Sequence, residues 1–226
     1  MMSVEEVLQN LELLGSEQAR KTYRRHGVKG PVFGVSYADQ GKLAKKLKSN
    51  PELAPGLWAS GNHDARVLAL SIGDAQQTTG EQVDEWMSDL SDYVISDGLS
   101  GYIGRTALAR ENMDAWMCST DEWRGTVGWN VLASLAINDQ ALPDAFFEPY
   151  LSNIERDIHG SKNRTRYAMN NALIAIGMRN EALEMRAIDA ATRIGKVIVD
   201  HGETNCKTRD ASTYIKQANE RRAPKV

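Results

Sequence analysis

The chain has 226 residues, 42% of them hydrophobic and 25% charged, and this composition excludes a fibrous or disordered protein. Its formal net charge of −3 excludes a generally basic nucleic-acid binder, so any nucleic-acid surface has to be a local patch. The two cysteines lie far apart, which does not fit a disulfide framework, and the acidic start does not fit a secretion signal. No apolar run is long enough to span a membrane, and together these features predict a cytoplasmic protein.

Apolar residues recur at three- and four-residue spacing along most of the chain, which is the pattern of amphipathic helices. Residues 1–49 are expected to form an N-terminal cap of short helices. The first of them follows Ser3, whose spacing from Glu6 predicts a capping box, and Ser36 is expected to cap a lysine-rich helix. Alternating β patterns are nearly absent, and the short run at 197–200 continues a helical stripe.

The segment 58–66, "WASGNHDAR", has the composition of a reactive site. His63 and Asp64 are adjacent, however, so they point in different directions on a helix and lack the spacing of a helical metal pair. Gly61 suits a left-handed position after one helix, and Asn62 suits the N-cap of the next. The segment is therefore predicted to be a junction between helices, with its tryptophan packed between them.

The rest of the chain divides into helix pairs. Ser119 and Glu122 are expected to form a capping box, Pro143 to open another helix, and the polar stretch 200–215 to close the last pair as a turn. The pairs are predicted at 51–73, 81–103, 109–138, 143–177 and 181–220.

A repeat of about 30 to 40 residues is typical of HEAT-type helix pairs, which stack into a solenoid with a concave surface. We therefore predict an all-α fold, a HEAT-like α-α superhelix built as a solenoid of antiparallel helix pairs. It is expected to form a single domain over residues 1–226, with repeats at about 50–220 and a frayed tail at 221–226. A non-repeating helical bundle is the alternative.

The run "YRRHGVKGPVFGVSYADQGKLAKKL", followed by "ELAPGLWASGNHDARVLALSI", resembles the DNA alkylation repair protein family, the AlkD-like alkylpurine DNA glycosylases with HEAT repeats. The resemblance covers about residues 23–180 and is most specific in "LWASGNHDAR". It implies a HEAT-like solenoid that binds alkylated or otherwise damaged duplex DNA on a concave basic face as a monomer. It also implies excision of cationic N3- and N7-alkylpurines by hydrolysis of the N-glycosidic bond, without a cofactor or metal.

That chemistry requires few protein groups, because the alkylated purine is already a cationic leaving group. A carboxylate near the sugar stabilises the oxocarbenium-like charge and orients water. Aromatic faces attract the cationic base, and basic side chains hold the flanking phosphates.

Carried onto this sequence, the family's aromatic and acid, four residues apart on one helix, fall on Tyr93 and Asp97, which become the candidate catalytic pair. The family's arginine falls on Thr126 and its second tryptophan on Asn171, so two positions depart from the pattern. With Trp129 they are the candidates for facing the lesion. The candidate DNA-binding cations are Arg24, Arg25, Lys42, Lys45, Lys46, Arg164 and Arg166.

Other interpretations of these residues stay open. Asp97 can be a solvated or capping acid, and the lysines can form a solvated face. At the level of the protein, the alternatives to a glycosylase are a non-catalytic binder of DNA structures and a HEAT-type scaffold for another protein. Cys206 lies near cations in the 200–215 stretch, but no general base is positioned beside it by the sequence, so a nucleophilic role is not expected.

Overall fold

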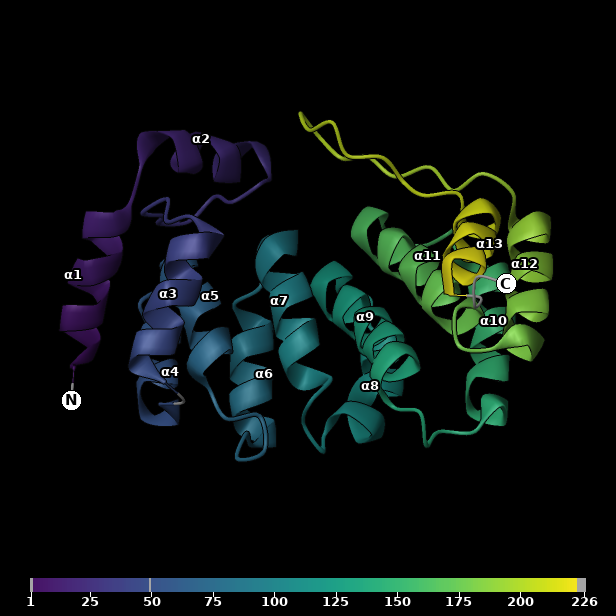
Figure 1. Cartoon of the computed structure of the whole chain (residues 1–226), viewed down its shortest axis with the longest axis horizontal. Helices are drawn as coiled ribbons and strands as arrows, with labels where there is room; N and C mark the ends of the chain where they lie inside the picture. Colours follow the sequence, from purple (N-terminus) through teal and green to yellow (C-terminus); the bar gives the residue numbers. More distant parts are fainter. Residues whose placement is uncertain (1, 49, 223–226) are drawn as a thin grey trace. The chain divides into compact units, whose positions relative to one another are not determined.

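The computed structural model describes residues 2–48 and 50–222, and this part of the chain is helical with no strand (Figure 1). Its helices are α1 (Val4–Leu14), α2 (Glu17–Arg25), α3 (Tyr37–Leu47), the short 3-10 helix η1 (Pro51–Leu53), α4 (Ala54–Ala59), α5 (His63–Ile72), α6 (Gly80–Ser88), α7 (Tyr93–Ile103), α8 (Ala109–Met117), α9 (Glu122–Asn138), α10 (Asp144–Asp157), α11 (Asn163–Gly177), α12 (Glu181–Ile194) and α13 (Ala211–Arg222). None of these described helices is long and apolar enough to cross a membrane.

The chain divides into two compact units. The N-terminal unit comprises Met1–Leu108 together with Gly202–Thr204, and the C-terminal unit comprises Ala109–His201 together with Asn205–Val226. The predicted helix pairs fall within the units: α4 with α5 and α6 with α7 in the first, and α8 with α9, α10 with α11 and α12 with α13 in the second. A single-domain organisation stays a prediction.

The core of the N-terminal unit is built around stacked aromatic rings. Trp58 of α4 and Trp86 of α6 are fully buried, and their ring centroids lie 4.6 Å apart with nearly parallel planes. Trp86 also packs against Tyr102 of α7, at 5.5 Å. Offset aromatic pairs contribute about 0.5 to 1.5 kcal/mol beyond the area they bury. The predicted packing role of Trp58 is confirmed.

The junction predicted at segment 58–66 is also confirmed. Gly61 has a φ of 69°, in the left-handed region, and ends the α4 segment. The side chain of Asn62 accepts hydrogen bonds from the backbone N–H groups of Asp64 and Ala65 and so caps α5.

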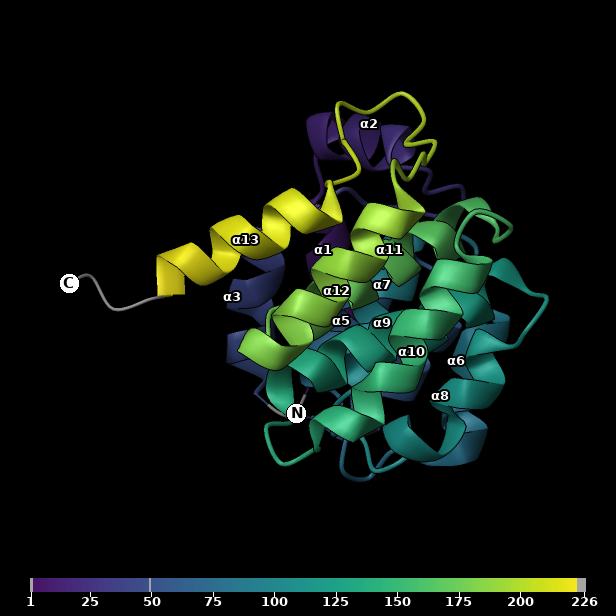
Figure 2. The ribbon, with the colours of Figure 1, turned by 90° about the vertical axis from the view of Figure 1, so that its right-hand side faces the viewer.

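The buried carboxylate of Asp64 holds the loop that precedes α3. It accepts hydrogen bonds from the backbone N–H groups of Phe33 (2.7 Å), Gly34 (3.0 Å) and Val35 (2.9 Å). The amide of Gln40 donates a fourth, at 3.2 Å. Asp64 is fully buried, so this loop is fixed on the N-terminus of α5 by charge-assisted hydrogen bonds that solvent does not weaken. As a result α2 lies across the ends of α5 and α7 (Figures 1 and 2).

In the C-terminal unit, α9 and α11 pack against each other along most of their lengths. The predicted capping box of Ser119 and Glu122 is wrong. The N-cap of α9 is Asp121, whose carboxylate accepts from the Arg124 N–H at 2.9 Å. Glu122 instead accepts from the backbone N–H of Arg164, at 2.6 Å, and joins the starts of α9 and α11.

The segment between α12 and α13 differs from the prediction. The helical stripe was expected to continue through 197–200, but α12 ends at Ile194, where Gly195 has a φ of 69°. Residues 195–210 form a long non-helical excursion that leaves α12 and returns to α13 (Figures 1 and 2). The last helix continues to Arg222, so the predicted tail at 221–226 begins inside α13, and its residues 223–226 lie outside the described part of the chain.

Candidate functional site

The N-terminal unit contains an open pocket of about 830 Å³ between α2, α5 and α7. This volume lies in the range of about 300 to 1,000 Å³ that is usual for small-molecule sites. The lining residues are Thr22, Tyr23, His26, Tyr37, Val67, Leu70, Ser71, Tyr93, Val94, Asp97, Gly98, Gly101, Tyr102 and Arg105. Four tyrosines, one histidine, one carboxylate, one guanidinium and the hydroxyls of Thr22 and Ser71 therefore surround a space whose other lining residues are apolar or glycine.

One wall of the pocket is a face of α7. The helix begins after Asp92, whose carboxylate caps the N–H groups of Val94 and Ile95. Tyr93 and Asp97 are one turn apart and both line the pocket, so the structure brings the predicted pair together. Asp97 is exposed, and Tyr93 is half-buried.

Tyr93 is held from the opposite side of the pocket by His26, the C-cap residue of α2. The Tyr93 hydroxyl and the Nδ1 atom of His26 share a hydrogen bond, and the two rings meet edge to face with centroids 6.0 Å apart. The direction of the bond depends on the tautomer of the imidazole. The contact fixes the orientation of the Tyr93 ring over the pocket.

Two further tyrosines form the wall near α3. Tyr37, the first residue of α3, is 58% exposed and meets Tyr23 edge to face at 5.9 Å. The hydroxyl of Tyr23 donates to the carbonyl oxygen of Val35 at 2.5 Å. Desolvation first, and then the carboxylates of Asp92, Asp64 and Asp97, raise the pKa of Tyr37. Its phenol is therefore neutral at physiological pH and presents a donor and an aromatic face.

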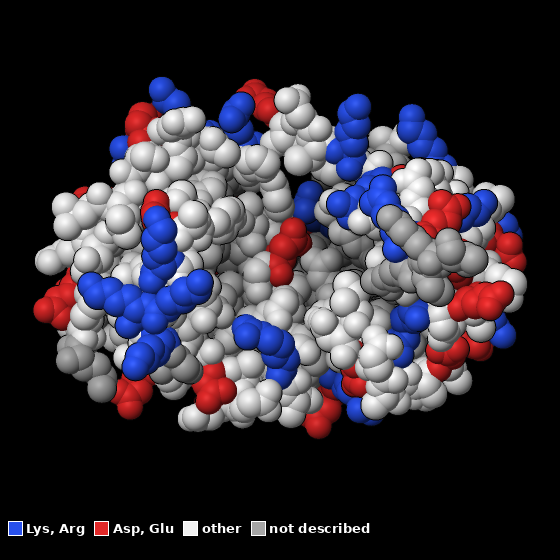
Figure 3. Space-filling model, viewed as in Figure 1, with Lys and Arg blue, Asp and Glu red and all other residues white. Residues whose placement is uncertain are grey.

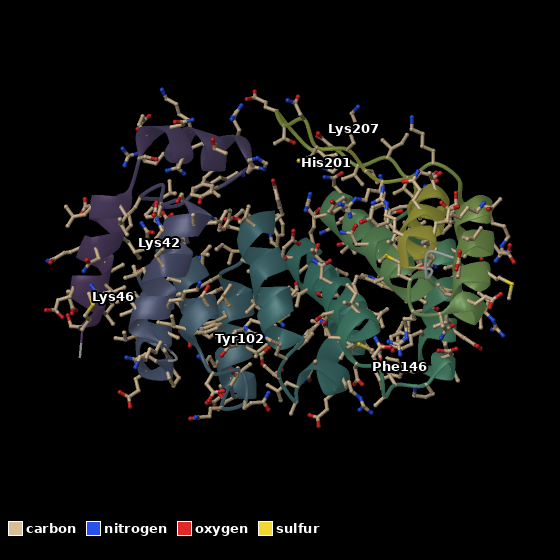
Figure 4. The ribbon with its side chains drawn as sticks, viewed as in Figure 1. Lys42, Lys46, Tyr102, Phe146, His201 and Lys207 are labelled. Carbon is tan, nitrogen blue, oxygen red and sulfur yellow. The ribbon has the colours of Figure 1, made fainter. Side chains whose placement is uncertain are left out.

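The predicted cations of the N-terminal unit are exposed. Lys42, Lys45 and Lys46 lie on the outer part of α3, where Figure 3 shows positive side chains gathered and Figure 4 labels two of them. Lys42 forms an ion pair with Asp39 at 2.8 Å. Arg24 donates to the carbonyl oxygens of Val28 and Gly30, both at 2.8 Å. Phosphate binding by these lysines and by the exposed Arg25 stays a prediction.

The two arginines predicted to hold phosphates in the C-terminal unit have other partners. The guanidinium of Arg166 donates four hydrogen bonds, to the carbonyl oxygens of Ile158, Ile198, His159 and Ser161. It therefore anchors the 195–210 excursion and the end of α10 to α11, and its role in DNA binding stays a prediction.

Arg164 also has a partner within its unit, and its predicted role in DNA binding stays untested. It is only 8% exposed, and its guanidinium carbon lies 4.7 Å from the centroid of the Tyr167 ring. A buried guanidinium that stacks on an aromatic face stabilises the fold and is poorly placed to neutralise a phosphate.

The three candidates for facing the lesion also lie in the C-terminal unit. Thr126 is buried, and its hydroxyl donates to the carbonyl oxygen of Glu122 at 2.7 Å. Trp129 is 5% exposed and packs edge to face against Tyr150. These two side chains pack inside their unit, and their predicted place facing the lesion stays a prediction. Asn171 is half-buried, and its role stays a prediction.

Comparison with known proteins gives the family. The sequence model of the DNA alkylation repair enzyme family matches residues 7–215. The chain belongs to the DNA alkylation repair family. Two relatives described as uncharacterized proteins, from Listeria innocua and Listeria monocytogenes, are 30% and 29% identical over 227 residues, which is 98% of this chain and 99% of each relative.

One solved structure is similar to this member of the DNA alkylation repair family. Its protein is described as part of a new family related to the HEAT-like repeat DNA glycosylases, with affinity for branched DNA structures. It matches with a TM-score of 0.89 at 32% sequence identity, over 97% of this chain and 95% of that chain. The predicted all-α, HEAT-like fold is confirmed.

The sequence pattern of the DNA alkylation repair family did not indicate His26, Tyr37 or Arg105 as residues of this pocket. Arg105 had a signal, since it continues the four-residue steps from Tyr93 and Asp97. His26 had none, because its partner Tyr93 is 67 residues away along the chain.

Proposed function

We propose that this protein binds branched or otherwise distorted DNA, and that the DNA contacts the lysines of α3 and the tyrosine-lined pocket of the N-terminal unit. The proposal rests on one observation: a single helix, α3, begins in the wall of the pocket and ends in the exposed lysines. The affinity for branched DNA described for the similar structure supports it.

The geometry of α3 fits a nucleic-acid strand. Tyr37 and Lys46 are nine residues apart, which at a rise of about 1.5 Å per residue is roughly 13 Å along the helix. Phosphates follow one another every 3.4 Å or so along the axis of one DNA strand, so this length corresponds to about four nucleotide steps. Lys45 lies about a quarter turn round the helix from Tyr37 and Lys46 about half a turn, so a strand whose phosphates contact Lys45 has a base within reach of the pocket.

Branched DNA fits this surface better than an uninterrupted duplex. The bases of a duplex are stacked and paired, whereas a branch point that carries unpaired positions has bases able to contact aromatic side chains. The net charge of −3 also gives little general attraction to phosphate backbones. Affinity therefore has to come from the local lysines and from contacts that a branch point makes available.

Fluorescence anisotropy with labelled DNA tests the proposal. A forked junction with unpaired positions at the branch and a duplex of equal length and base composition are titrated at several salt concentrations. The junction is expected to bind at least tenfold more tightly than the duplex. Equal affinities would refute structure-selective binding, and no binding to either DNA would favour the protein-scaffold alternative.

A second candidate function is excision of cationic alkylpurines, favoured by Tyr93 and Asp97 lying one turn apart in the same pocket wall. In that reaction the carboxylate of Asp97 stabilises the developing sugar cation and positions water, while the ring of Tyr93 lies against the charged base. The burial of Thr126 and the bonds that Arg166 makes to backbone carbonyl oxygens weigh against it, because they leave little of either side chain for DNA.

The test of excision is release of 3-methyladenine or 7-methylguanine from methylated duplex DNA under single-turnover conditions. If excision occurs, Asp97→Asn is expected to lower the rate by about a hundredfold or more, as for loss of one electrostatic group in a transition state. Tyr93→Trp restores the aromatic of the family and is expected to raise the rate. Absence of release by the wild-type protein removes this candidate and leaves the binding proposal standing.

A further inference from the structure

Two glycines shape the pocket wall formed by α7. Gly98 and Gly101 lie within this 11-residue helix and both line the pocket. Glycine is an unfavourable residue inside a helix, and neither of these has the positive φ that would require it. A Cβ atom at Gly101 would meet no heavy atom within 4 Å. What glycine provides here is a bare stretch of helix backbone open to the pocket.

A planar ring fits against such a surface. The bare backbone at Gly101 shares the pocket with two aromatic side chains that solvent reaches: Tyr93, two turns earlier on the same face of α7, and Tyr37 from α3. Unpaired nucleobases are commonly bound by stacking on aromatic side chains, because every base has two apolar faces. The volume of about 830 Å³ admits a nucleotide together with water.

The edge of the ring would face Asp97. Among the described lining residues it is the one carboxylate, it is exposed, and it lies one turn before Gly101 on the same face of α7. An ionised carboxylate only accepts hydrogen bonds, and its two oxygens match two adjacent N–H donors. Guanine has such a pair, N1–H and the 2-amino group. The Watson–Crick edges of adenine, cytosine and thymine place an acceptor beside each donor, and a carboxylate repels that acceptor.

From this geometry we infer that the pocket binds an unpaired guanine of the DNA, stacked among the tyrosines and hydrogen-bonded to Asp97 along its Watson–Crick edge. The inference rests on the proposed DNA binding and names the element of the DNA that this pocket reads. Asp97 here contacts the base and not the sugar, so the site retains a base without cleaving its bond.

The experiment measures binding of the full chain to five forked junctions that differ in one unpaired position at the branch: guanine, adenine, cytosine, thymine or an abasic site. The guanine junction is expected to bind at least tenfold more tightly than the abasic one, a difference of about 1.4 kcal/mol. Adenine, cytosine and thymine are expected to fall between the two.

Two variants locate the effect. Gly101→Leu fills the pocket, favours the helix and meets no neighbour through its Cβ atom, so it is expected to fold and to bind the guanine and abasic junctions equally, at the affinity of the wild-type protein for the abasic one. Gly80→Leu, at an exposed glycine outside the pocket with an equally open Cβ position, is the matched control and is expected to keep the tenfold difference. Asp97→Asn is expected to keep stacking and to lose the preference for guanine over adenine.

The outcomes separate the two proposals. Junctions that bind no better than duplex refute the proposed function. If junctions are preferred but guanine and abasic junctions bind equally, or if Gly101→Leu weakens both to the same degree, the pocket does not hold a base and this inference is wrong. A guanine preference that survives in Asp97→Asn also overturns the assignment of the edge contact.

Discussion

Replacing Asp64 with asparagine tests whether this carboxylate organises the loop that shapes the pocket. Its two oxygens accept three backbone N–H groups and the amide of Gln40, in a fully buried position. In Asp64→Asn the carbonyl oxygen can retain the donors of Phe33 and Gly34, but the new amide nitrogen faces the N–H of Val35. One buried backbone donor then loses its acceptor.

The expected loss of stability follows from these contacts. A buried donor without an acceptor costs about 1 to 3 kcal/mol, and two charge-assisted bonds become neutral ones, each weaker by roughly 0.5 to 1 kcal/mol. Gln40 offsets part of this cost, because its Oε1 atom is buried without a described partner and an amide flip lets it accept from the new NH2 group. We therefore expect Asp64→Asn to lower the free energy of unfolding by about 3 kcal/mol, against a total of roughly 5 to 15 kcal/mol for a domain.

Urea unfolding followed by far-ultraviolet circular dichroism measures this loss. Glu85→Gln, which also neutralises a carboxylate on a helix of the same unit but at an exposed position, is the control and should change stability by less than about 0.5 kcal/mol. If Asp64→Asn unfolds at the same urea concentration as this control, the carboxylate does not hold the loop and the account of the pocket's construction fails.

Three further predictions concern other parts of the chain. Lys45→Glu combined with Lys46→Glu should weaken binding to all DNA and lower the logarithmic salt slope by about 2, at roughly 0.9 per phosphate contact. The control Arg110→Glu, at an exposed position of α8, should change neither the affinity nor the slope. An unchanged slope in the double variant rules out α3 as the phosphate contact. Cys206→Ala should leave DNA binding and any base release intact, and complete loss of activity in the folded variant would revive a nucleophilic role. The backbone N–H of Thr213 and neighbouring hydroxyls lower the pKa of Asp210 below its ordinary 3.8. The contribution of Asp210 to stability is therefore complete above about pH 4 and is lost as the pH falls through the lowered pKa. Thermal unfolding of Asp210→Asn should depend less on pH below 4 than that of the wild-type protein, and an equal dependence would contradict this.

The parts of the fold that sequence predicted are those set by local chemistry. The Ser3 and Glu6 capping box is present in both directions, and Asn62 caps α5 as its position indicated. The boundaries that failed depended on one backbone angle or on a choice between neighbouring caps. The apolar residues at 197–199 continue the helical period, yet the left-handed Gly195 ends α12 before them.

The candidate site was predictable in part. The four-residue spacing of Tyr93 and Asp97 placed them on one face, because helix geometry fixes that relation. The contacts of Arg166 could not be predicted, because its four acceptors are carbonyl oxygens at positions 158, 159, 161 and 198, and backbone acceptors leave no mark on residue type. The contact between His26 and Tyr93 likewise depends on how α2 folds back over α7, which follows from the Asp64 contacts and not from either residue's neighbours in sequence.

The most direct test of the proposed function is ultraviolet crosslinking of the protein to a branched DNA, followed by mass spectrometry of the crosslinked peptides. The proposal predicts crosslinks on the α3 and α7 peptides, at Tyr37, Tyr93 and the lysines of α3, that are lost when an equal excess of unlabelled junction competes and persist when the competitor is duplex. Crosslinks confined to peptides outside the N-terminal unit, or competed equally by duplex, would contradict it.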